Sequence, residues 1–421
     1  MFDYRAVSDA CVKCGKCIPV CTIHQINRDE TTGPRGFLHL LGAYQTGKLE
    51  LDKNVNGIFG SCCLCTNCVE VCPNILPVDM LIEQVRRDIG EKYGIVWYKR
   101  LAFFFLRNRK IMDLVAKFGY VFQTCGFKLL KPQNSMMLRK FPLIKFDRLL
   151  PSLAKKSFLN SYPDVIENGG KGKVGIFIGC LGNYMYTDIG KALLEILKVL
   201  EIDAYLIKQQ KCCGAPSYFT GDFKSVDVLA KFNIAYIEKF KELDAIIIPE
   251  ATCSAMIKED YVHFFHDQPE WRIRAEAIKP KIFMATDYLY KKTDLKKILA
   301  TKSKKNGPIT YHDACHARKM QGVFREPREL LSQNYLIKEM SNPNRCCGFG
   351  GVTIQSEKYH LAKAAGEPKA KMIIQTEAEV VSAECSACQM QIGNALHQAG
   401  SKVIFKNPIE LIAKALREDG F

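Results

Sequence analysis

The chain has 421 residues, a hydrophobic fraction of 48%, a mean hydropathy of −0.08 and a formal net charge of +16. This length predicts two or three domains with a large buried core. No apolar run approaches the roughly 18 residues that a membrane-spanning helix needs, so we expect a protein that is soluble or lies on a membrane surface. Nineteen cysteines without an N-terminal signal peptide favour a reducing compartment, where thiols bind metals and do not form disulfides.

Two cysteine runs with the spacing C-x2-C-x2-C-x3-C lie within the first 72 residues. The first run contains Cys11, Cys14, Cys17 and Cys21, and the second contains Cys62, Cys65, Cys68 and Cys72. This spacing is that of two-cluster bacterial ferredoxins, in which three cysteines of a run bind one [4Fe–4S] cluster and the fourth binds the other. We therefore predict one cubane cluster on Cys11, Cys14, Cys17 and Cys72, and a second on Cys62, Cys65, Cys68 and Cys21.

Zinc and disulfides are the alternatives for these cysteines. Four-cysteine zinc sites usually consist of two C-x2-C pairs with a longer spacer, and a disulfide framework suits secreted proteins. Neither explains two copies of this run. Cys63 also lies inside the second run, and we interpret it as a packed or spare thiol because the spacing is complete without it. A predicted helix over Phe37–Leu41, between the runs, favours a helical ferredoxin over the compact β type.

A basic segment follows the ferredoxin-like region. Residues Arg86–Asn160 contain 17 Lys/Arg and 4 Asp/Glu, so most of the excess positive charge lies in this segment. Positive and negative charges are nearly balanced in the rest of the chain, which argues against general nucleic-acid binding. The segment is predicted to be helical, with apolar stripes formed by Trp97, Leu101, Phe104, Phe105, Ile111, Leu114, Val115, Phe118, Phe122 and Cys125. Basic amphipathic helices of this kind bind anionic bilayers. Alternatively, the stripes pack on the protein's own core or on a partner protein, and Cys125 is then a core thiol.

The remainder alternates predicted strands and helices, which indicates α/β structure with parallel sheets. The strands are Val174–Ile178, Ala245–Ile248, Ile309–Tyr311 and Val380–Ser382. This region is duplicated with an offset of 132 to 135 residues: the first copy contains Cys180, Cys212, Cys213 and Cys253, and the second contains Cys315, Cys346, Cys347, Cys385 and Cys388. Each copy carries its cysteines after predicted strands, where parallel sheets bind ligands. A vicinal redox disulfide or zinc would not explain why an isolated cysteine and a C-x2-C pair recur at matched distances.

Taken together, these patterns predict a multidomain α+β protein. The expected domains are a helical two-cluster ferredoxin over residues 1–85, a basic amphipathic helical linker over 86–165, a first repeat over 166–300 and a second over 301–421. The pattern C…CCG…C-x2-C resembles the cysteine-rich CCG domain of heterodisulfide reductase subunits. It is also similar to the iron–sulfur subunits of glycolate oxidase, of L-lactate utilisation systems and of anaerobic glycerol-3-phosphate dehydrogenase. The runs Tyr311–His316, Cys346–Gly351 and Gly393–Leu396 are typical of the lactate and glycolate members.

The resemblance implies a further cofactor. In heterodisulfide reductases a complete five-cysteine motif holds a noncubane [4Fe–4S] cluster, which implies a third cluster and a redox site on Cys315, Cys346, Cys347, Cys385 and Cys388. In the first repeat Met256 replaces the last cysteine and leaves Cys180, Cys212, Cys213 and Cys253. A thioether is a poor iron ligand, so this repeat holds either an ordinary cluster or a structural remnant.

Five polar residues lie close to Cys315 in the sequence: His312, Asp313, His316, Arg318 and Lys319. They could tune the reduction potential of a cluster or bind an anion or a quinone head; the alternative is that they are structural.

The sequence has no nucleotide-binding glycine fingerprint, so substrate oxidation is expected on a partner flavoprotein. The resemblance thus implies an iron–sulfur electron-transfer subunit that passes electrons from a glycolate, lactate or glycerol-3-phosphate dehydrogenase to membrane quinone. We expect it to be peripheral on the cytoplasmic face of the inner membrane. The alternatives are a heterodisulfide reductase-type catalytic subunit, a CCG subunit of a fumarate or succinate system, and a non-enzymatic thiol or zinc scaffold.

Overall fold

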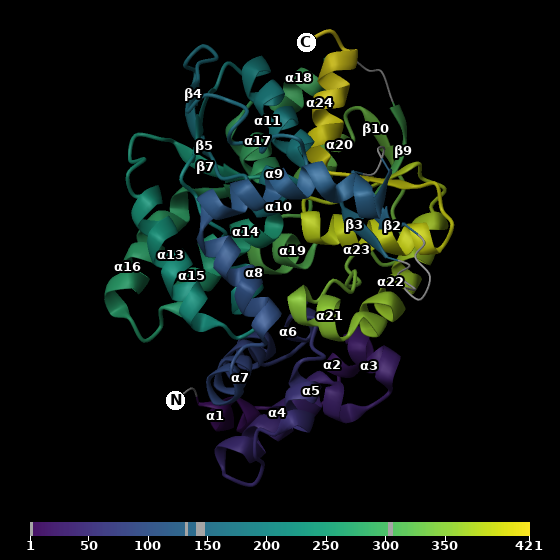
Figure 1. Ribbon diagram of the computed structural model, residues 1–421. Coiled ribbons are helices and arrows are strands. Elements are labelled where there is room, and N and C mark those ends of the chain that lie inside the picture. Colours follow the sequence, from purple (N-terminus) through teal and green to yellow (C-terminus); the bar gives the residue numbers. More distant parts are fainter. Residues whose placement is uncertain (1–2, 131–133, 140–147, 302–305) are drawn as a thin grey trace. The chain divides into compact units, whose positions relative to one another are not determined.

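The computed structural model describes residues 3–130, 134–139, 148–301 and 306–421 (Figure 1). Contacts between residues divide the chain into two compact units, each built from segments that are distant in the sequence. The first unit comprises Met1–Phe103, Gly214–Asp227 and Asn344–Lys369, and the second comprises Phe104–Cys213, Val228–Pro343 and Ala370–Phe421. The domain boundaries expected near residues 85, 165 and 300 stay predictions.

The N-terminal part of the first unit is helical. Its helices are α1 (Tyr4–Asp9), α2 (Cys17–Val20), α3 (Thr22–Asn27), η1 (Glu30–Thr32), α4 (Pro34–Gln45), α5 (Lys53–Phe59), α6 (Asn67–Glu70) and α7 (Val78–Tyr93), and the described part of this unit contains no strand. The helix predicted over Phe37–Leu41 is confirmed as part of α4, which begins at Pro34, a residue suited to the first helical position. Phe37 of α4 packs against Phe59 of α5, with ring centroids 5.9 Å apart, in the unit's core.

The second unit contains two mainly parallel sheets. The first has the order β4-β6-β5-β7-β8, formed by β4 (Val165–Ile166), β5 (Lys173–Ile176), β6 (Asp203–Leu206), β7 (Ala245–Ile248) and β8 (Ile282–Met284). The second has the order β10-β9-β11-β12, formed by β9 (Asn306–Tyr311), β10 (Tyr335–Ile337), β11 (Val380–Ser382) and β12 (Ile404–Lys406). Among the described strands of these two sheets, β4 alone is antiparallel to its neighbour. Without β4, both sheets share one strand order, so the duplication extends to topology and the predicted strands are confirmed.

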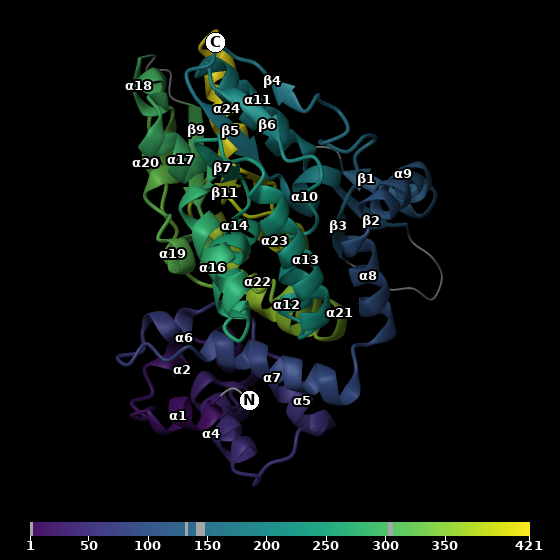
Figure 2. The same ribbon diagram turned by 90° about the vertical axis from the view of Figure 1, so that its left-hand side faces the viewer.

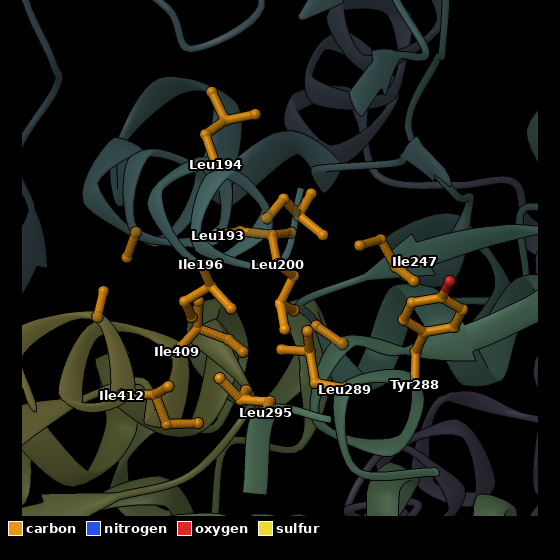
Figure 3. Packing of buried hydrophobic residues seen from close by; sticks show 14 of the residues in the cluster. Leu193, Leu194, Ile196, Leu200, Ile247, Tyr288, Leu289, Leu295, Ile409 and Ile412 are labelled. Carbon is orange, nitrogen blue, oxygen red and sulfur yellow. The ribbon is translucent and has the colours of Figure 1, made fainter. Parts of the chain in front are cut away.

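The helices of the two repeats share one hydrophobic core. α11 (Thr187–Val199) packs against α24 (Pro408–Glu418), and α17 (Ala285–Lys292) packs against α20 (Glu326–Leu331). α11 and α24 lie side by side in both views (Figure 1 and Figure 2). At their interface Ile196 points toward Ile409 (Figure 3). A single core that contains residues of both sheets joins those parts of the two repeats that belong to the second unit.

The basic segment is helical only in part. α8 (Trp97–Arg107) and α9 (Arg109–Gly126) are followed by an antiparallel sheet of β1 (Phe127–Leu130), β2 (Ser135–Leu138) and β3 (Leu149–Pro151). The prediction of a helix throughout residues 86–160 is therefore wrong beyond α9. Asn134, with φ of 47°, gives the chain a left-handed turn before β2, and Phe127 then pairs with Leu138. Residues 131–133 and 140–147 of this segment lie outside the described residues.

The other helices complete the two repeats. They are α10 (Gly179–Tyr184), α12 (Ala215–Tyr218), α13 (Phe223–Ile237), α14 (Ala251–Ala255), η3 (Met256–Asp260), α15 (Tyr261–Phe264), α16 (Pro269–Ile278), η4 (Lys279–Lys281), α18 (Leu295–Ala300), α19 (Cys315–Gln321), α21 (Gly351–Glu357), α22 (Tyr359–Ile374) and α23 (Ser386–Gln398). In the first sheet the chain passes from β5 to β6 on one side and then crosses to β7 on the other side of β5, and in the second sheet it passes in the same way from β9 to β10 and then to β11. Such a switch point is where open parallel sheets bind ligands.

Candidate metal centres

The first group of ferredoxin cysteines contains residues from both sequence runs. Cys17 begins α2, and its thiol lies within electrostatic range of Cys11, Cys14 and Cys72. All four line one hollow of about 430 Å³, to which Cys68 also contributes. Burial, together with a smaller effect of the neighbouring thiols, raises the pKa of Cys17 to about 11. Because sulfurs that disfavour one another's ionisation share this space, a cationic iron–sulfur core would fit them.

The second group contains Cys21, Cys62, Cys65 and Cys68, which together with Cys63 line a second hollow of about 450 Å³. The backbone N–H of Leu64 donates to Cys62 Sγ, and that of His24 donates to Cys21 Sγ, both at 3.4 Å. Burial raises the pKa of Cys62 to about 12 and that of Cys21 to about 11. Backbone donors aimed at sulfur stabilise a thiolate once metal is bound, so these residues also fit a cluster.

Cys63 is not a spare surface thiol. Its side chain is hydrogen-bonded to Cys346, the first vicinal cysteine of the second repeat, and both residues belong to the first unit. This hydrogen bond, together with burial, raises the pKa of Cys63 well above its ordinary value. The sequence interpretation of Cys63 as a packed thiol missed this partner, because the two residues are 283 positions apart.

Two cations, the buried Arg86 and the half-buried Lys358, connect the CCG segments of the first unit to the loop that carries Cys62. The Arg86 guanidinium donates to Phe219 O at 2.7 Å, to Phe59 O at 2.9 Å and to Cys62 O at 2.8 Å. Lys358 Nζ donates to Ser61 Oγ at 2.9 Å. The loop that carries Cys62 is therefore held by residues on both sides. No sequence signal distinguished Arg86 from the other basic residues of its region.

The first repeat brings its four cysteines together within the second unit. Cys180 is hydrogen-bonded to Cys212, and Cys213 is hydrogen-bonded to Cys212 and Cys253. Gly179, at φ of +72°, permits this approach, because a Cβ there would lie 2.9 Å from Cys253 Sγ. Beside them a cavity of about 340 Å³ is lined in part by Cys180 and Cys212. The fit to an iron–sulfur cluster is thus partial: four thiols converge at the switch point, but Met256, the residue in the fifth position, is an apolar and fully buried side chain.

The cysteines of the second repeat are distributed over both units. Cys346 and Cys347 belong to the first unit, and Cys315, Cys385 and Cys388 belong to the second. Cys385 accepts a hydrogen bond from the backbone N–H of Cys388 at 3.4 Å, and Cys346 accepts one from that of Gly348 at 3.3 Å. Gly348 has φ of +87°, and a Cβ there would lie 2.4 Å from that of Ala365, so only glycine fits. Within each unit, backbone donors directed at sulfur are suited to thiolate ligands.

The polar residues around Cys315 have structural partners. Asp313, with a fully buried side chain, pairs with Arg318 at 2.7 Å and with Arg328 at 2.6 Å. The ring of His312 contacts Pro343 O through Nδ1 at 3.1 Å, whereas His316 Nδ1 lies 3.4 Å from Cys315 Sγ. Asp313 and Arg318 therefore agree with the structural interpretation, while His316 is close enough to influence Cys315.

Two buried glutamates connect the repeats and were missed in the sequence. Glu384 accepts hydrogen bonds from the backbone N–H groups of Ala285 at 2.9 Å and Thr286 at 3.3 Å, and from the Thr286 hydroxyl. Burial nevertheless raises the pKa of Glu384 to about 8. Glu250 accepts from Ser386 N at 2.7 Å, and its pKa is also raised by burial. The only signal for these residues in the sequence was their position: Glu384 directly precedes Cys385, and Glu250 lies three residues before Cys253.

The apolar stripe of α9 faces outward. Phe118 and Phe122 are 57% and 62% exposed, and the remaining exposed apolar residues of the helix are Ile111, Leu114, Val115 and Val121. Cys125 is also exposed, so its interpretation as a core thiol is wrong: the core-facing side of α9 is formed by Ala116 and Gln123. The stripe therefore does not pack on the protein's own core. Among the described residues, no helix has the length and apolarity to cross a bilayer.

Comparison with known proteins agrees with this arrangement. The 4Fe-4S dicluster domain matches residues 7–76, and the cysteine-rich domain CCG matches residues 174–258 and 309–393. The chain is 28% identical to the probable glycolate oxidase iron-sulfur subunit of Bacillus subtilis, over 93% of this chain and 89% of that protein. It is 32% identical to lactate utilization protein A of Bacillus cytotoxicus, over 55% of this chain and 94% of that protein.

A third relative, a subunit of the CoM/CoB fumarate reductase of Methanothermobacter marburgensis, is 27% identical over 97% of this chain and 72% of that protein. Fold, cysteine groups and domain matches define an iron–sulfur protein that joins a dicluster ferredoxin domain to a duplicated cysteine-rich domain. The chain belongs to the CCG-domain family that includes lactate utilization protein A and the glycolate oxidase iron-sulfur subunit. The predicted family is confirmed.

Proposed function

We propose that this chain is the iron–sulfur subunit of a respiratory oxidoreductase, and that it carries electrons from a flavoprotein dehydrogenase to membrane quinone. The observation that carries the proposal is that the two proposed sets of four thiols line two hollows of the first unit, with Cys68 lining both. Each set takes its fourth sulfur from the other run, as a two-cluster ferredoxin requires. The cubane ligands are Cys11, Cys14, Cys17 and Cys72 for one cluster, and Cys62, Cys65, Cys68 and Cys21 for the other.

The second CCG repeat is the proposed destination of the electrons. Cys315, Cys346, Cys347, Cys385 and Cys388 supply five thiols for a third cluster, and the hydrogen bonds that Cys346 and Cys385 accept support thiolate character there. The cluster would supply one-electron redox chemistry; the protein's residues hold it and set its surroundings. The first repeat, with Met256 in the fifth position, is not assigned a cluster.

The substrate side is assigned by relatedness. Relatives are named for glycolate oxidase and for lactate utilization, so the electron donor is proposed to be a flavoprotein that oxidises a 2-hydroxy acid. Glycerol 3-phosphate, a phosphorylated polyol, is the alternative substrate. The chain is proposed to act on the cytoplasmic face of the inner membrane. None of the nineteen cysteines, which all lie in the described part of the chain, forms a disulfide, as a reducing compartment favours. The exposed apolar stripe of α9 supports attachment to the membrane surface.

Metal analysis of anaerobically purified protein tests the proposal. Iron, labile sulfide and electron paramagnetic resonance (EPR) spectra are measured on the same sample. About twelve iron per chain is expected, eight in the cubane clusters and four in the second repeat. About eight iron would remove the third cluster from the proposal, and about sixteen would place a cluster in the first repeat as well. Colourless protein that contains zinc and no iron would end it.

A second candidate function rests on one comparison. The CoM/CoB fumarate reductase relative matches nearly the whole chain, which favours a protein in which the CCG half itself reduces a disulfide or serves a fumarate system. If the first proposal holds, the purified protein should transfer electrons from a reduced viologen dye to an added quinone, and the dye should become oxidised. Oxidation on addition of a heterodisulfide, and none on addition of a quinone, would favour the second.

A further inference from the structure

The two ferredoxin cysteine runs form loops with the same backbone conformation. In the first run Lys13 and Gly15 have φ of 56° and 76°, and at the matching positions of the second run Leu64 and Thr66 have φ of 51° and 56°. Both pairs lie between successive cysteines of the C-x2-C-x2-C spacing, where the chain must turn so that three thiols converge. Any difference between the loops in exposure therefore comes from their side chains and surroundings, and not from what a cluster requires of the backbone.

The second loop is closed to solvent. Leu64 is 4% exposed, and Thr66 and Asn67 are each 8% exposed. Asn67 also donates from Nδ2 to Val20 O at 3.2 Å, which fastens the loop to the rest of the ferredoxin region. A partner protein therefore has little access to this loop.

The first loop is open to solvent around a proposed cluster ligand. Cys14 is exposed, and so are Lys13 and Lys16 on either side of it. Val12 carries an apolar side chain that is 63% exposed. Because electron transfer slows steeply with distance, a redox partner needs access of this kind to a ligand of the cluster that it reduces.

Ile75 supplies a second exposed apolar side chain, and its backbone is strained. The residue is 72% exposed and has φ of 49°, in the left-handed region that β-branched residues avoid. The preceding residue, Asn74, lines the hollow of the first group of ferredoxin cysteines and donates from Nδ2 to Ala10 O at 2.8 Å, directly before Cys11. Burial does not explain an isoleucine in this conformation, and strain of this kind is characteristic of functional sites.

We propose that these exposed residues form a docking surface, here named the entry face, for the flavoprotein that donates electrons. The entry face consists of Val12, Lys13, Cys14, Lys16 and Ile75. The inference rests on the proposed function and adds to it the place at which the donor binds. Two exposed apolar side chains together with two lysines fit a partner surface that is apolar at its centre and acidic at its rim.

The entry face also sets the order of electron transfer. In the step that it serves, the reduced flavin of the partner loses one electron and the cluster of the first group of ferredoxin cysteines gains it, and no atom is transferred. The cluster of the second group, whose loop is closed to solvent, then receives its electrons from the first cluster and not from the flavin.

The flavin content of the complex that this chain forms in its native host provides the test. The tagged chain is isolated anaerobically, and flavin and iron per chain are measured for wild type, for Lys13→Glu combined with Lys16→Glu, and for Ile75→Asn. The matched control is Lys48→Glu combined with Lys53→Glu, at two exposed lysines of the same unit. Flavin per chain should fall at least about tenfold in both test variants and should match wild type in the control, with iron unchanged throughout.

The Ile75→Asn variant separates docking from folding. Asparagine tolerates the left-handed region, so the thermal unfolding midpoint of this variant should equal or exceed that of wild type while flavin is lost. A lower midpoint would assign Ile75 to the stability of the fold and overturn its place in the entry face. After reduction with dithionite, each variant should keep the EPR signal of the first cluster, and loss of that signal would assign the exchanged residues to cluster assembly and overturn the inference.

Failure of the inference and failure of the proposed function give different results. Flavin retained by both test variants would show that the donor binds elsewhere, which overturns the entry face and leaves the proposed function intact. If the wild-type chain itself brings down no flavoprotein, the proposed function loses its electron donor and the inference fails with it.

Discussion

The carboxylate of Glu250, just after β7 of the first repeat, accepts a hydrogen bond at 2.7 Å from the backbone N–H of Ser386, the first residue of α23 in the second repeat. In the opposite direction, Glu384 of the second repeat accepts hydrogen bonds from the backbone N–H groups of the first two residues of α17, in the first repeat. Each glutamate thus satisfies N–H groups that a helix start leaves without partners. The exchange holds the carboxyl ends of both sheets, where cysteines of both repeats lie, in one fixed arrangement.

Removal of this cross-connection should destabilise the second unit. Glu384→Ala leaves three buried donors without their acceptor, and we expect the free energy of unfolding to fall by about 3 kcal/mol. The thermal unfolding midpoint, followed by circular dichroism, should decrease accordingly. Glu242→Ala, at an exposed glutamate, is the matched control and should leave the midpoint unchanged. A Glu384→Ala midpoint equal to that of the control would contradict a stabilising role for the connection.

The ion pairs of Asp313 predict a second stability effect. Asp313→Ala removes a buried carboxylate that pairs with the guanidinium groups of both Arg318 and Arg328. Because breaking a buried pair is costly, we expect a loss of about 3 kcal/mol. The exposed pair of Arg5 and Asp9 is the matched control, and Asp9→Ala should change stability by less than about 0.5 kcal/mol. If both variants unfold at the same temperature, the Asp313 pairs do not stabilise the fold.

The spacing of the cysteines and the short apolar runs typical of strands were sufficient to predict many of the secondary-structure elements and the family. The strand after Gly172, the strands that precede the cysteines, and the helix over Phe37–Leu41 all have strong local patterns, and the structure contains each of them. The family follows from the same cysteine spacing. Local patterns of this kind survive folding because the residues that form them are neighbours in the chain.

Features that depend on distant contacts were not predictable. The antiparallel sheet after α9 is stabilised by strand pairing, which the helical periodicity of residues 97–125 does not reveal. The outward orientation of α9, with Cys125 exposed, depends on which side of the helix contacts the rest of the unit, as Gln123 does through its hydrogen bonds with the backbone of Leu153. The partner of Cys63 and the role of Arg86 likewise require tertiary structure.

The crossed ligand assignment makes a third prediction. Cys72→Ala should remove the cluster of the first run, although Cys72 belongs to the second, and Cys21→Ala should remove the cluster of the second run. Each variant is expected to lose about four iron and one of the two cubane EPR signals, and the signal that remains should differ between them. Cys125→Ala should keep all iron. Loss of the same signal in both variants would contradict the crossed assignment.

The exposed stripe of α9 makes the last prediction. We expect the protein to co-sediment with vesicles that contain anionic lipid, because the apolar residues can enter the headgroup boundary while Lys110 and Lys117, exposed on the same helix, interact with lipid phosphates. Phe118→Asp combined with Phe122→Asp should weaken binding at least about tenfold, since each buried phenylalanine contributes about 1.5–3 kcal/mol. Ile273→Asp, at an apolar residue of α16 that is 65% exposed, is the matched control and should bind like wild type.

Salt and lipid charge separate this mechanism from nonspecific adhesion. Raising the ionic strength should weaken binding of the wild-type protein to anionic vesicles, because salt screens the attraction of the lysines. Vesicles of neutral lipid should bind less, since only the apolar contribution remains. Equal binding to both lipid types, or full binding by the double aspartate variant with intact iron content, would show that α9 is not the attachment surface. The stripe would then be left for a partner protein, and co-purification of the wild type but not the double variant with a flavoprotein would identify it.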